Sequence, residues 1–313
     1  MATTTTITTT YAGEKKRGYI ATALLSANTI ENGGVSVNQN VKYKEVIKQM
    51  AVSGLIADGT CDFDATGAVV LTERYLEPEE FQVNMQLCKK DFRSDWEAIS
   101  MGYSAWDNLP PDFQTFLVAR VIAQVAEANE RILWQGDAGI GGEYDGFLTL
   151  MAADAGVVNN ITGVSIDATN VVDELGKIVD LAVSSNEAII SKEDAYIYIP
   201  QNVYRAYIRS LGGFGASGLG AAGFEDRGSN QTIAPMVFEG FKLFVANGLP
   251  SNKMIFARSS NLWFATGLMD DRTELKIIDM EDIDLSQNVR LGMRWTADVN
   301  YGIPEEIITY GVK

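Results

Sequence analysis

The sequence predicts a mixed α+β protein, and three features of its 313 residues indicate this class. Residues 111–135 carry apolar side chains at the three- and four-residue spacing of a long amphipathic helix. Residues 81–88 alternate apolar and polar side chains, as a half-buried strand does. From about Thr169 onward, helix-like and strand-like segments alternate. The sequence is therefore expected to combine early strands and one long helix with a later α/β segment in one large chain.

The composition predicts a buried core and excludes several kinds of catalytic site. Hydrophobic residues make up 46% of the chain and charged residues 21%, the balance of a globular protein. The chain has no histidine, which is the commonest general base and transition-metal ligand. We therefore predict a protein that is not an enzyme, with no catalytic residue and no cofactor.

No segment is typical of a membrane span or a secretion signal. The longest apolar runs fall far short of the ~18 residues that a transmembrane helix needs. Residues 1–10 contain seven threonines and lack the charged start and apolar stretch of a signal peptide. These observations predict a soluble protein made in a cytoplasm, without membrane association.

The net charge of −16 is unevenly distributed. Residues 1–50 sum to +3 and the remaining 263 residues to −19. So acidic a body repels phosphate backbones, which favours at most weak, non-specific contact with DNA. The basic cluster Lys15, Lys16 and Arg17 is a candidate contact with acidic surface on a neighbouring copy, and a solvated terminus is the equal alternative.

The first 92 residues predict an arm followed by a β-hairpin. Residues 1–40 cannot bury much apolar surface alone. The spacing of Val46, Met50 and Val52 predicts a short amphipathic helix over Tyr43–Ser53. Residues 68–72 and 81–88 read as strands, and residues 76–80, which include Pro78, predict the turn between them.

The predicted hairpin needs a surface to lie on, because an isolated two-stranded ribbon is only marginally stable. Its apolar face must contact either its own body or a neighbouring copy, which makes Phe81, Val83, Met85 and Leu87 candidate contact residues between subunits. The turn would place Cys88 opposite about residue 69, with Cys61 beyond the paired segment. Both thiols are therefore expected to be free.

The long helix is the strongest predicted element. Pro111 and Asp112 suit a helix N-terminus, Gly136 ends the helix, and about 25 residues would span roughly 37 Å. A glycine-rich loop over residues 136–146 follows. The later segments predict helices at 171–184 and 202–211, and strands at 195–199, 242–246, 254–257, 275–279, 289–300 and 306–310.

Two glycine motifs in residues 212–228 match the dinucleotide-binding fingerprint as a pattern. A phosphate-binding loop must leave a strand and enter a helix, whereas this segment follows a helix and precedes no helical period. We therefore predict a glycine loop without a cofactor. Its residues Gly213, Phe214 and Gly215 are candidate contacts between subunits.

One segment is close to a calcium-loop pattern. Asp62, Asp64 and Glu73 occupy the first, third and twelfth positions, with Gly67 at the sixth. Thr66 and Val70 depart from the ligand pattern, and the flanking segments read as loop and strand. A structural turn is favoured over a metal site. The acidic residues at 270–271 and 281–284 are read as a solvated or ion-pairing surface.

The order of these elements resembles the major capsid proteins of tailed bacteriophages with the HK97-type fold. Residues 76–92 and 109–113, residues 129–137 at the end of the long helix, and residues 144–148 look like phrases of that family. The resemblance covers nearly the whole chain.

The resemblance implies an arrangement of domains. Residues 1–55 would be the N-terminal arm and 56–92 an extended loop, a β-hairpin lying on an adjacent subunit. Residues 93–160 and 270–313 would form a peripheral domain around a spine helix at about 111–135, and 161–269 an α/β axial domain.

The resemblance also implies a function: self-assembly into pentamers and hexamers of an icosahedral phage head that encloses double-stranded DNA. The subunit would be found in the virion and assembled in the host bacterial cytoplasm. Expected partners are further copies of the chain, a separate scaffolding protein, a portal and decoration proteins. Two alternatives stay open. One is the shell of an encapsulin-like compartment, and the other is an α/β nucleotide-binding enzyme built on residues 161–269.

Overall fold

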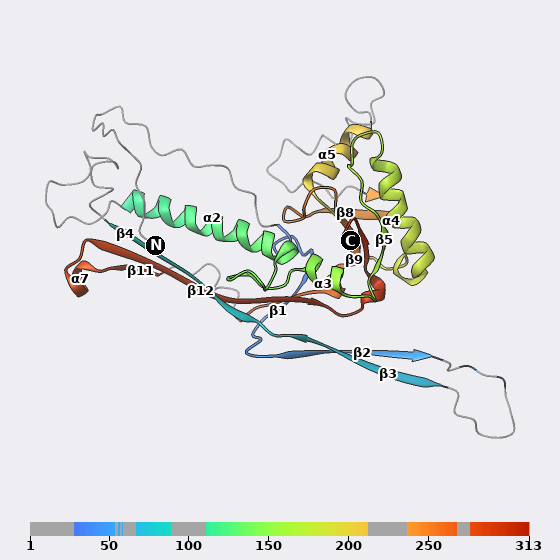
Figure 1. The fold of residues 1–313 in the computed structure, drawn as a ribbon, viewed down its shortest axis with the longest axis horizontal. Coiled ribbons are helices and arrows are strands. Elements are labelled where there is room, and N and C mark those ends of the chain that lie inside the picture. Colours follow the sequence, from blue (N-terminus) through green and yellow to red (C-terminus); the bar gives the residue numbers. More distant parts are fainter. Residues whose placement is uncertain are drawn as a thin grey trace.

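The computed structural model describes residues 28–53, 56, 58, 67–88, 111–211, 237–267 and 276–312. Figure 1 shows an elongated molecule in which a long helix lies above a long sheet. A compact α/β unit lies at the right-hand end of the long helix and sheet. A two-stranded ribbon projects to the right below this unit. Among the described residues, no helix combines the length and apolarity needed to cross a membrane.

The long sheet is built on the 14-residue strand β12 (Asn288–Tyr301). Strand β4 (Glu79–Cys88) pairs antiparallel with it over ten positions, from Asn288 opposite Cys88 to Ala297 opposite Glu79. β12 also pairs with β11 (Lys276–Asp279) and β10 (Leu262–Ala265), and β10 pairs in parallel with β1 (Ser36–Asn38). Segments from the N-terminal part and the C-terminal part of the chain therefore share one sheet.

The α/β unit is a six-stranded sheet covered by two helices. Its strand order is β5 (Val158–Ile161), β13 (Ile308–Tyr310), β9 (Met254–Arg258), β6 (Ala195–Ile199), β8 (Phe241–Val245) and β7 (Val237–Phe238). The amphipathic helices α4 (Val171–Ser185) and α5 (Gln201–Ser210) bury their apolar faces in the core of this unit.

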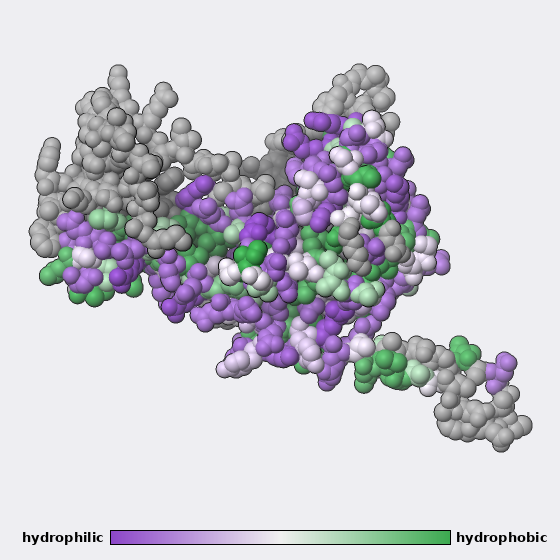
Figure 2. All heavy atoms as spheres, viewed as in Figure 1, coloured by the Kyte–Doolittle hydropathy of each residue, from purple (hydrophilic) through white to green (hydrophobic). Residues whose placement is uncertain are grey.

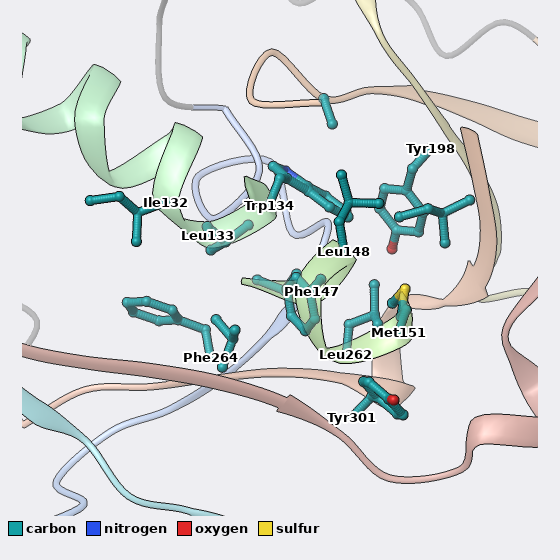
Figure 3. Packing of buried hydrophobic residues seen from close by; sticks show 14 of the residues in the cluster. Ile132, Leu133, Trp134, Phe147, Leu148, Met151, Tyr198, Leu262, Phe264 and Tyr301 are labelled. Carbon is teal, nitrogen blue, oxygen red and sulfur yellow. The ribbon is translucent and has the colours of Figure 1, made fainter. Parts of the chain in front are cut away.

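The spine helix α2 (Pro111–Gln135) ends inside a second core. There Trp134 packs on Phe147 of α3 (Phe147–Ala153) and on Tyr198 of β6, with ring centroids 5.4 Å apart in both pairs. Figure 3 shows these rings between the helix end and the long sheet. Gly136 allows the turn, because a Cβ there would lie 2.1 Å from the carbonyl oxygen of Tyr144.

Residues 28–34 are tied to this core. The buried Glu130 accepts a hydrogen bond from the Thr29 amide at 3.2 Å and another from the Thr29 hydroxyl. Trp134 Nε1 donates to the same hydroxyl at 3.0 Å. Burial raises the pKa of Glu130 above its ordinary value, although these hydrogen bonds oppose the shift. These hydrogen bonds fix Thr29 to the spine helix shortly before the chain enters strand β1.

The ribbon consists of β2 (Glu45–Ser53) and β3 (Ala68–Leu76), paired antiparallel over nine positions. It forms a sheet of its own. Its base contacts the body, in part through a small cluster in which Ile47 and Leu76 pack with Val41 and Ala265.

The long helix, the glycine loop that follows it and the strand at 195–199 are confirmed. The helices at 171–184 and 202–211, and the strands at 242–246, 254–257, 275–279, 289–300 and 306–310, are also confirmed, with small shifts at their ends. Strands β1, β5, β7 and β10 are additional to the sequence-based expectation.

Two predictions in the first 92 residues are wrong. The segment predicted as a helix over 43–53 contains strand β2, Glu45–Ser53, because Val46 and Met50 fit a two-residue period as well as a four-residue one. Residues 68–76 and 81–88 are both strands, but they do not pair with each other. The chain crosses at Pro78 from the ribbon to the edge of β12, so residues 76–80 form a crossover and not a hairpin turn.

Two strands also belong to a different sheet from the one that the predicted domain boundaries imply. The closing strand β13, placed in the segment 270–313, belongs to the six-stranded sheet. Strand β10, placed in the segment 161–269, belongs to the long sheet. Both cores are therefore assembled from segments that are distant in the sequence.

Candidate assembly surfaces

The ribbon has two chemically different faces. In an antiparallel pair, residues directly opposite each other share a face, and the next pair lies on the other one. The pairs Val46–Tyr75, Lys48–Glu73 and Met50–Leu71 therefore share one face, together with Val69. We call this set the outer face of the ribbon. The opposite face carries Ile47, Arg74 and Leu76 near its base, and Gln49, Thr72 and the half-exposed Val70 further out.

The outer face exposes an unusual amount of apolar surface. Met50 is 65% exposed, Leu71 68% and Val69 61%, while Val46 and Tyr75 are 40% and 45% exposed. Figure 2 shows hydrophobic side chains along this projection, clear of the body. A contiguous apolar strip on a projecting element marks a contact surface, because its exposure to water costs free energy without any gain within the subunit.

An ion pair anchors the base of the ribbon. The Arg74 guanidinium donates a hydrogen bond to Asp154 at the end of α3 and lies 4.5 Å from the centre of the Tyr301 ring. The Tyr301 hydroxyl donates to the same carboxylate at 3.0 Å. Burial acts to raise the pKa of Asp154, but the hydrogen bonds from Arg74, Gly156 and Tyr301 outweigh it and hold this pKa below its ordinary range.

A partly buried carboxylate holds the crossover from β3 to β4. Asp298 on β12 accepts the amide hydrogen of Glu77 at 2.7 Å, and Asn300 Nδ2 donates to the carbonyl oxygen of Tyr75 at 2.7 Å. Burial, with the nearby charges of Glu79 and Glu77, raises the pKa of Asp298 to about 6. The ribbon is thus fixed at its base by charged and polar groups, while its outer face is apolar.

A second exposed apolar cluster lies at the opposite end of the long axis. The short helix α7 (Glu281–Asp284) joins β11 to β12, and Figure 1 places this connection at the far left of the molecule. Ile283 is 67% exposed and Leu285 77%, next to Ile277 and Ile278 of β11 at 38% and 49%. We call these four residues the apolar tip; Figure 2 shows hydrophobic side chains at this end.

The predicted contact residues on β4 are used within the subunit. The ring of Phe81 lies 5.7 Å from that of Tyr144 and 6.1 Å from that of Trp295. Val83 packs on the same core, Leu87 is buried, and Met85 is partly buried opposite Leu291. The body of the same chain covers this face in part, and the role of these residues between subunits stays a prediction.

The other predicted site residues are dispersed or lie outside the described part of the chain. Lys15, Lys16, Arg17, Asp62, Asp64, Gly213, Phe214, Gly215 and the remaining glycines of the dinucleotide-like motif are outside it. Glu73 is exposed on β3, where its carboxylate accepts a hydrogen bond from Tyr75 at 3.4 Å. No metal-binding group of three histidine, cysteine or acidic side chains occurs within the described ranges. Cys88 is a free thiol, opposite Asn288 and not residue 69.

Sequence reasoning missed the outer face of the ribbon and the apolar tip. A signal for the first was present, since Val46, Lys48, Met50 and Val52 alternate with period two, as do Val69, Leu71 and Glu73. For the tip, the apolar Ile283 and Leu285 within an acidic segment were the available signal.

Known proteins resemble this chain in structure and not in sequence. No family model matches the sequence, and a search of curated proteins finds no significant match. The capsid of a native GTA particle is similar with a TM-score of 0.62 and 16% identity, over 95% of this chain and 94% of that one. The capsid of the Myoviridae phage XM1 has a TM-score of 0.58 and 12% identity over 93% and 94%.

A structure from Mycobacterium phage Adephagia likewise has a TM-score of 0.58 and 12% identity, over 94% of both chains. These matches extend over nearly the full length of each chain. The protein has the HK97-type fold of the phage capsid subunits.

Proposed function

We propose that this protein is the major subunit of a phage head, which self-assembles into pentamers and hexamers of a closed icosahedral shell. The observation that carries the proposal is the ribbon. Its outer face presents five apolar side chains to water, on an element that leaves the body and returns to it. A soluble monomer has no use for such an element, whereas a shell subunit uses it to cover a neighbouring copy.

The proposal also rests on how the ribbon is built. Arg74 and Asp298 fix its direction at the base, so the outer face is presented in a defined orientation. A preoriented surface loses less conformational entropy on association than a flexible one. The fold shared with phage capsid structures supports the same function.

The test compares two adjacent residues of β3 that lie on opposite faces. Leu71→Glu places a charge in the outer face, and Thr72→Glu places the same charge on the other face. Both positions are exposed, so both variants should fold. We expect the wild type and Thr72→Glu to form rapidly sedimenting particles, visible by electron microscopy, and Leu71→Glu to remain as subunits or small oligomers.

A stable, folded monomer of the wild type under all assembly conditions would contradict the proposal. Equal assembly of the two variants would contradict the role of the outer face. The contents of purified particles separate a phage head, which holds double-stranded DNA when mature, from a compartment shell, which holds a cargo protein.

A further inference from the structure

The chain contains two Asn–Gly dipeptides, Asn32–Gly33 and Asn247–Gly248, and the two lie in different surroundings. Asparagine before glycine is prone to deamidation, because the next backbone nitrogen reaches the side-chain amide carbon most easily when no Cβ hinders it. Asn32 and Gly33 are both exposed, whereas Gly248 is buried and Asn247 is partly buried. The same dipeptide therefore occurs once in the open and once in a packed site.

Asn32–Gly33 lies in a turn between two fixed points. On one side, Thr29 is hydrogen-bonded to the buried Glu130 of the spine helix. On the other side, the carbonyl oxygen of Gly34 accepts a hydrogen bond from the Tyr198 hydroxyl. The amide of Gly34 also donates to the carbonyl oxygen of Thr29 at 2.9 Å, which closes the turn. The backbone between the two points therefore has a set length.

The reactive nitrogen of the first dipeptide is weakly held. Gly33 has a φ of +71°, and no described atom beyond its chain neighbours lies within 4 Å of where its Cβ would stand. Its amide donates only to the carbonyl oxygen of Ile30, at 3.3 Å, which is at the long end for such a bond. Ring closure onto Asn32 meets neither a steric barrier nor a strong hydrogen bond.

The corresponding nitrogen of the second dipeptide is firmly held. The Gly248 amide donates to the buried carboxylate of Glu130, and a Cβ at Gly248 would lie 2.1 Å from the Glu130 carbonyl oxygen and 2.7 Å from Trp134. The Asn247 amide donates to the side chain of Asn28 at 3.3 Å. Reaction there must break a hydrogen bond to a carboxylate and open the packing around it.

We propose that Asn32 is a spontaneous modification site, at which the Gly33 nitrogen converts the asparagine of the folded subunit into aspartate and isoaspartate. The Gly33 nitrogen gives its proton to hydroxide and attacks Cγ of Asn32. The new C–N bond closes a succinimide ring while the Cγ–Nδ2 bond breaks, and the leaving nitrogen takes a proton from water and departs as ammonia. A water molecule then opens the ring at either carbonyl. Water is consumed and ammonia released, without an oxidant or a reductant.

The isoaspartate product changes the turn. Its main chain runs through Cγ, which adds a methylene group to the backbone between Thr29 and Gly34. Because both ends of the turn are fixed, the longer chain cannot keep the hydrogen bond between the Gly34 amide and the Thr29 carbonyl. The segment that joins the first residues of the chain to the spine helix therefore loosens as the protein ages.

Peptide mass spectrometry of aged protein tests the reaction. In unassembled wild-type subunits kept folded at mildly alkaline pH, Asn32 should deamidate about a hundred times faster than Asn247, because the packed site must first open locally. In urea, where both sites are exposed, the two rates should become similar. This comparison separates the effect of the fold from that of the dipeptide. Equal rates in the folded subunit, or no conversion at Asn32, would overturn the proposal.

Hydrogen exchange tests the consequence. After ageing, the Gly34 amide of isoaspartate-containing subunits should exchange about ten times faster than in fresh protein. Asn32→Gln closes a ring far more slowly and should keep the original rate after the same treatment. Freshly purified Asn32→Asp adds the charge without the extra methylene and should also keep it. An unchanged rate in isoaspartate-containing subunits would refute the loosening, and none of these outcomes depends on whether the chain builds a shell.

Discussion

The core around Trp134 and the outer face of the ribbon use similar side chains for different purposes. Trp134, Phe147 and Tyr198 are fully buried, and the Trp134 indole N–H has a hydrogen-bond acceptor. Met50 and Leu71 are about two-thirds exposed and lie opposite each other in the paired strands of the ribbon. The first set stabilises the subunit, and the second set is free to contact another one.

The core and the ribbon are stabilised by different interactions. Apolar burial contributes about 25 cal/mol per Å² removed from water, and only the core receives that contribution within one chain. The ribbon depends instead on its base, where the polar anchors and the small apolar cluster of Ile47 and Leu76 hold it. Substitutions in the core should therefore unfold the subunit, and substitutions at the tip of the ribbon should not.

The largest expected effect is in the core. Trp134→Ala should lower the free energy of unfolding by about 3–5 kcal/mol, because it leaves a large cavity and removes the hydrogen bond to Thr29. Chemical denaturation of unassembled subunits measures the loss. Trp263→Ala, at a partly exposed tryptophan, is the control and should cost less. Similar losses for the two variants would mean that the core is not centred on Trp134.

The anchor of the ribbon should show an intermediate effect. Arg74→Ala removes the charged partner of Asp154 and the cation above the Tyr301 ring, so unfolding should become about 1–2 kcal/mol easier. Arg205→Ala, at an exposed arginine of α5, should change stability by less than about 0.5 kcal/mol. Hydrogen exchange should also become faster in β3. An unchanged exchange rate would show that Arg74 does not hold the ribbon.

We expect the stability of the folded subunit to depend on pH because of Asp298, which holds the crossover from β3 to β4. Its pKa of about 6 in the folded subunit exceeds the ordinary value of 3.8, so the folded state binds the proton more tightly. The stability from this group is complete below about pH 4 and is lost as the pH rises through 6. We expect a loss on the order of 1–2 kcal/mol, reduced by partial exposure to solvent.

Asp298→Asn keeps an acceptor for the Glu77 amide and removes the charge. Compared with the wild type, the variant should gain stability at pH 7 and show no difference at pH 4, as measured by urea denaturation at both pH values. Parallel pH profiles of the two proteins would refute the assignment.

Much of the fold could be predicted from the sequence, because its strongest elements are encoded locally. The apolar stripe of α2 repeats along 25 residues, and Pro111 and Gly136 mark its ends. Strand β6 was predicted at its observed bounds, since five residues rich in aromatic and β-branched side chains are typical of a buried strand.

The partners of each strand could not be predicted in the same way. Val46 and Met50 fit both periods, and pairing with residues 68–76, more than fifteen positions away, selects the strand. Leu76–Glu80 looks like a turn, but the amide of Glu77 binds Asp298, which is 221 residues distant. The contact surface was therefore assigned to β4, one strand away from where the structure exposes it.

The smallest expected effect is on the outer face itself. Leu71→Ser should change the free energy of unfolding of the isolated subunit by less than about 0.5 kcal/mol, because the side chain is already 68% exposed. The contact of Leu71 with its cross-strand neighbour Met50 contributes only about a few tenths of a kcal/mol to the free energy of unfolding. Leu133→Ser, at a fully buried leucine, should cost at least about 3 kcal/mol in the same urea titration. A loss above 1 kcal/mol for Leu71→Ser would mean that the outer face is already packed in the free subunit, and the division between core and ribbon would fail.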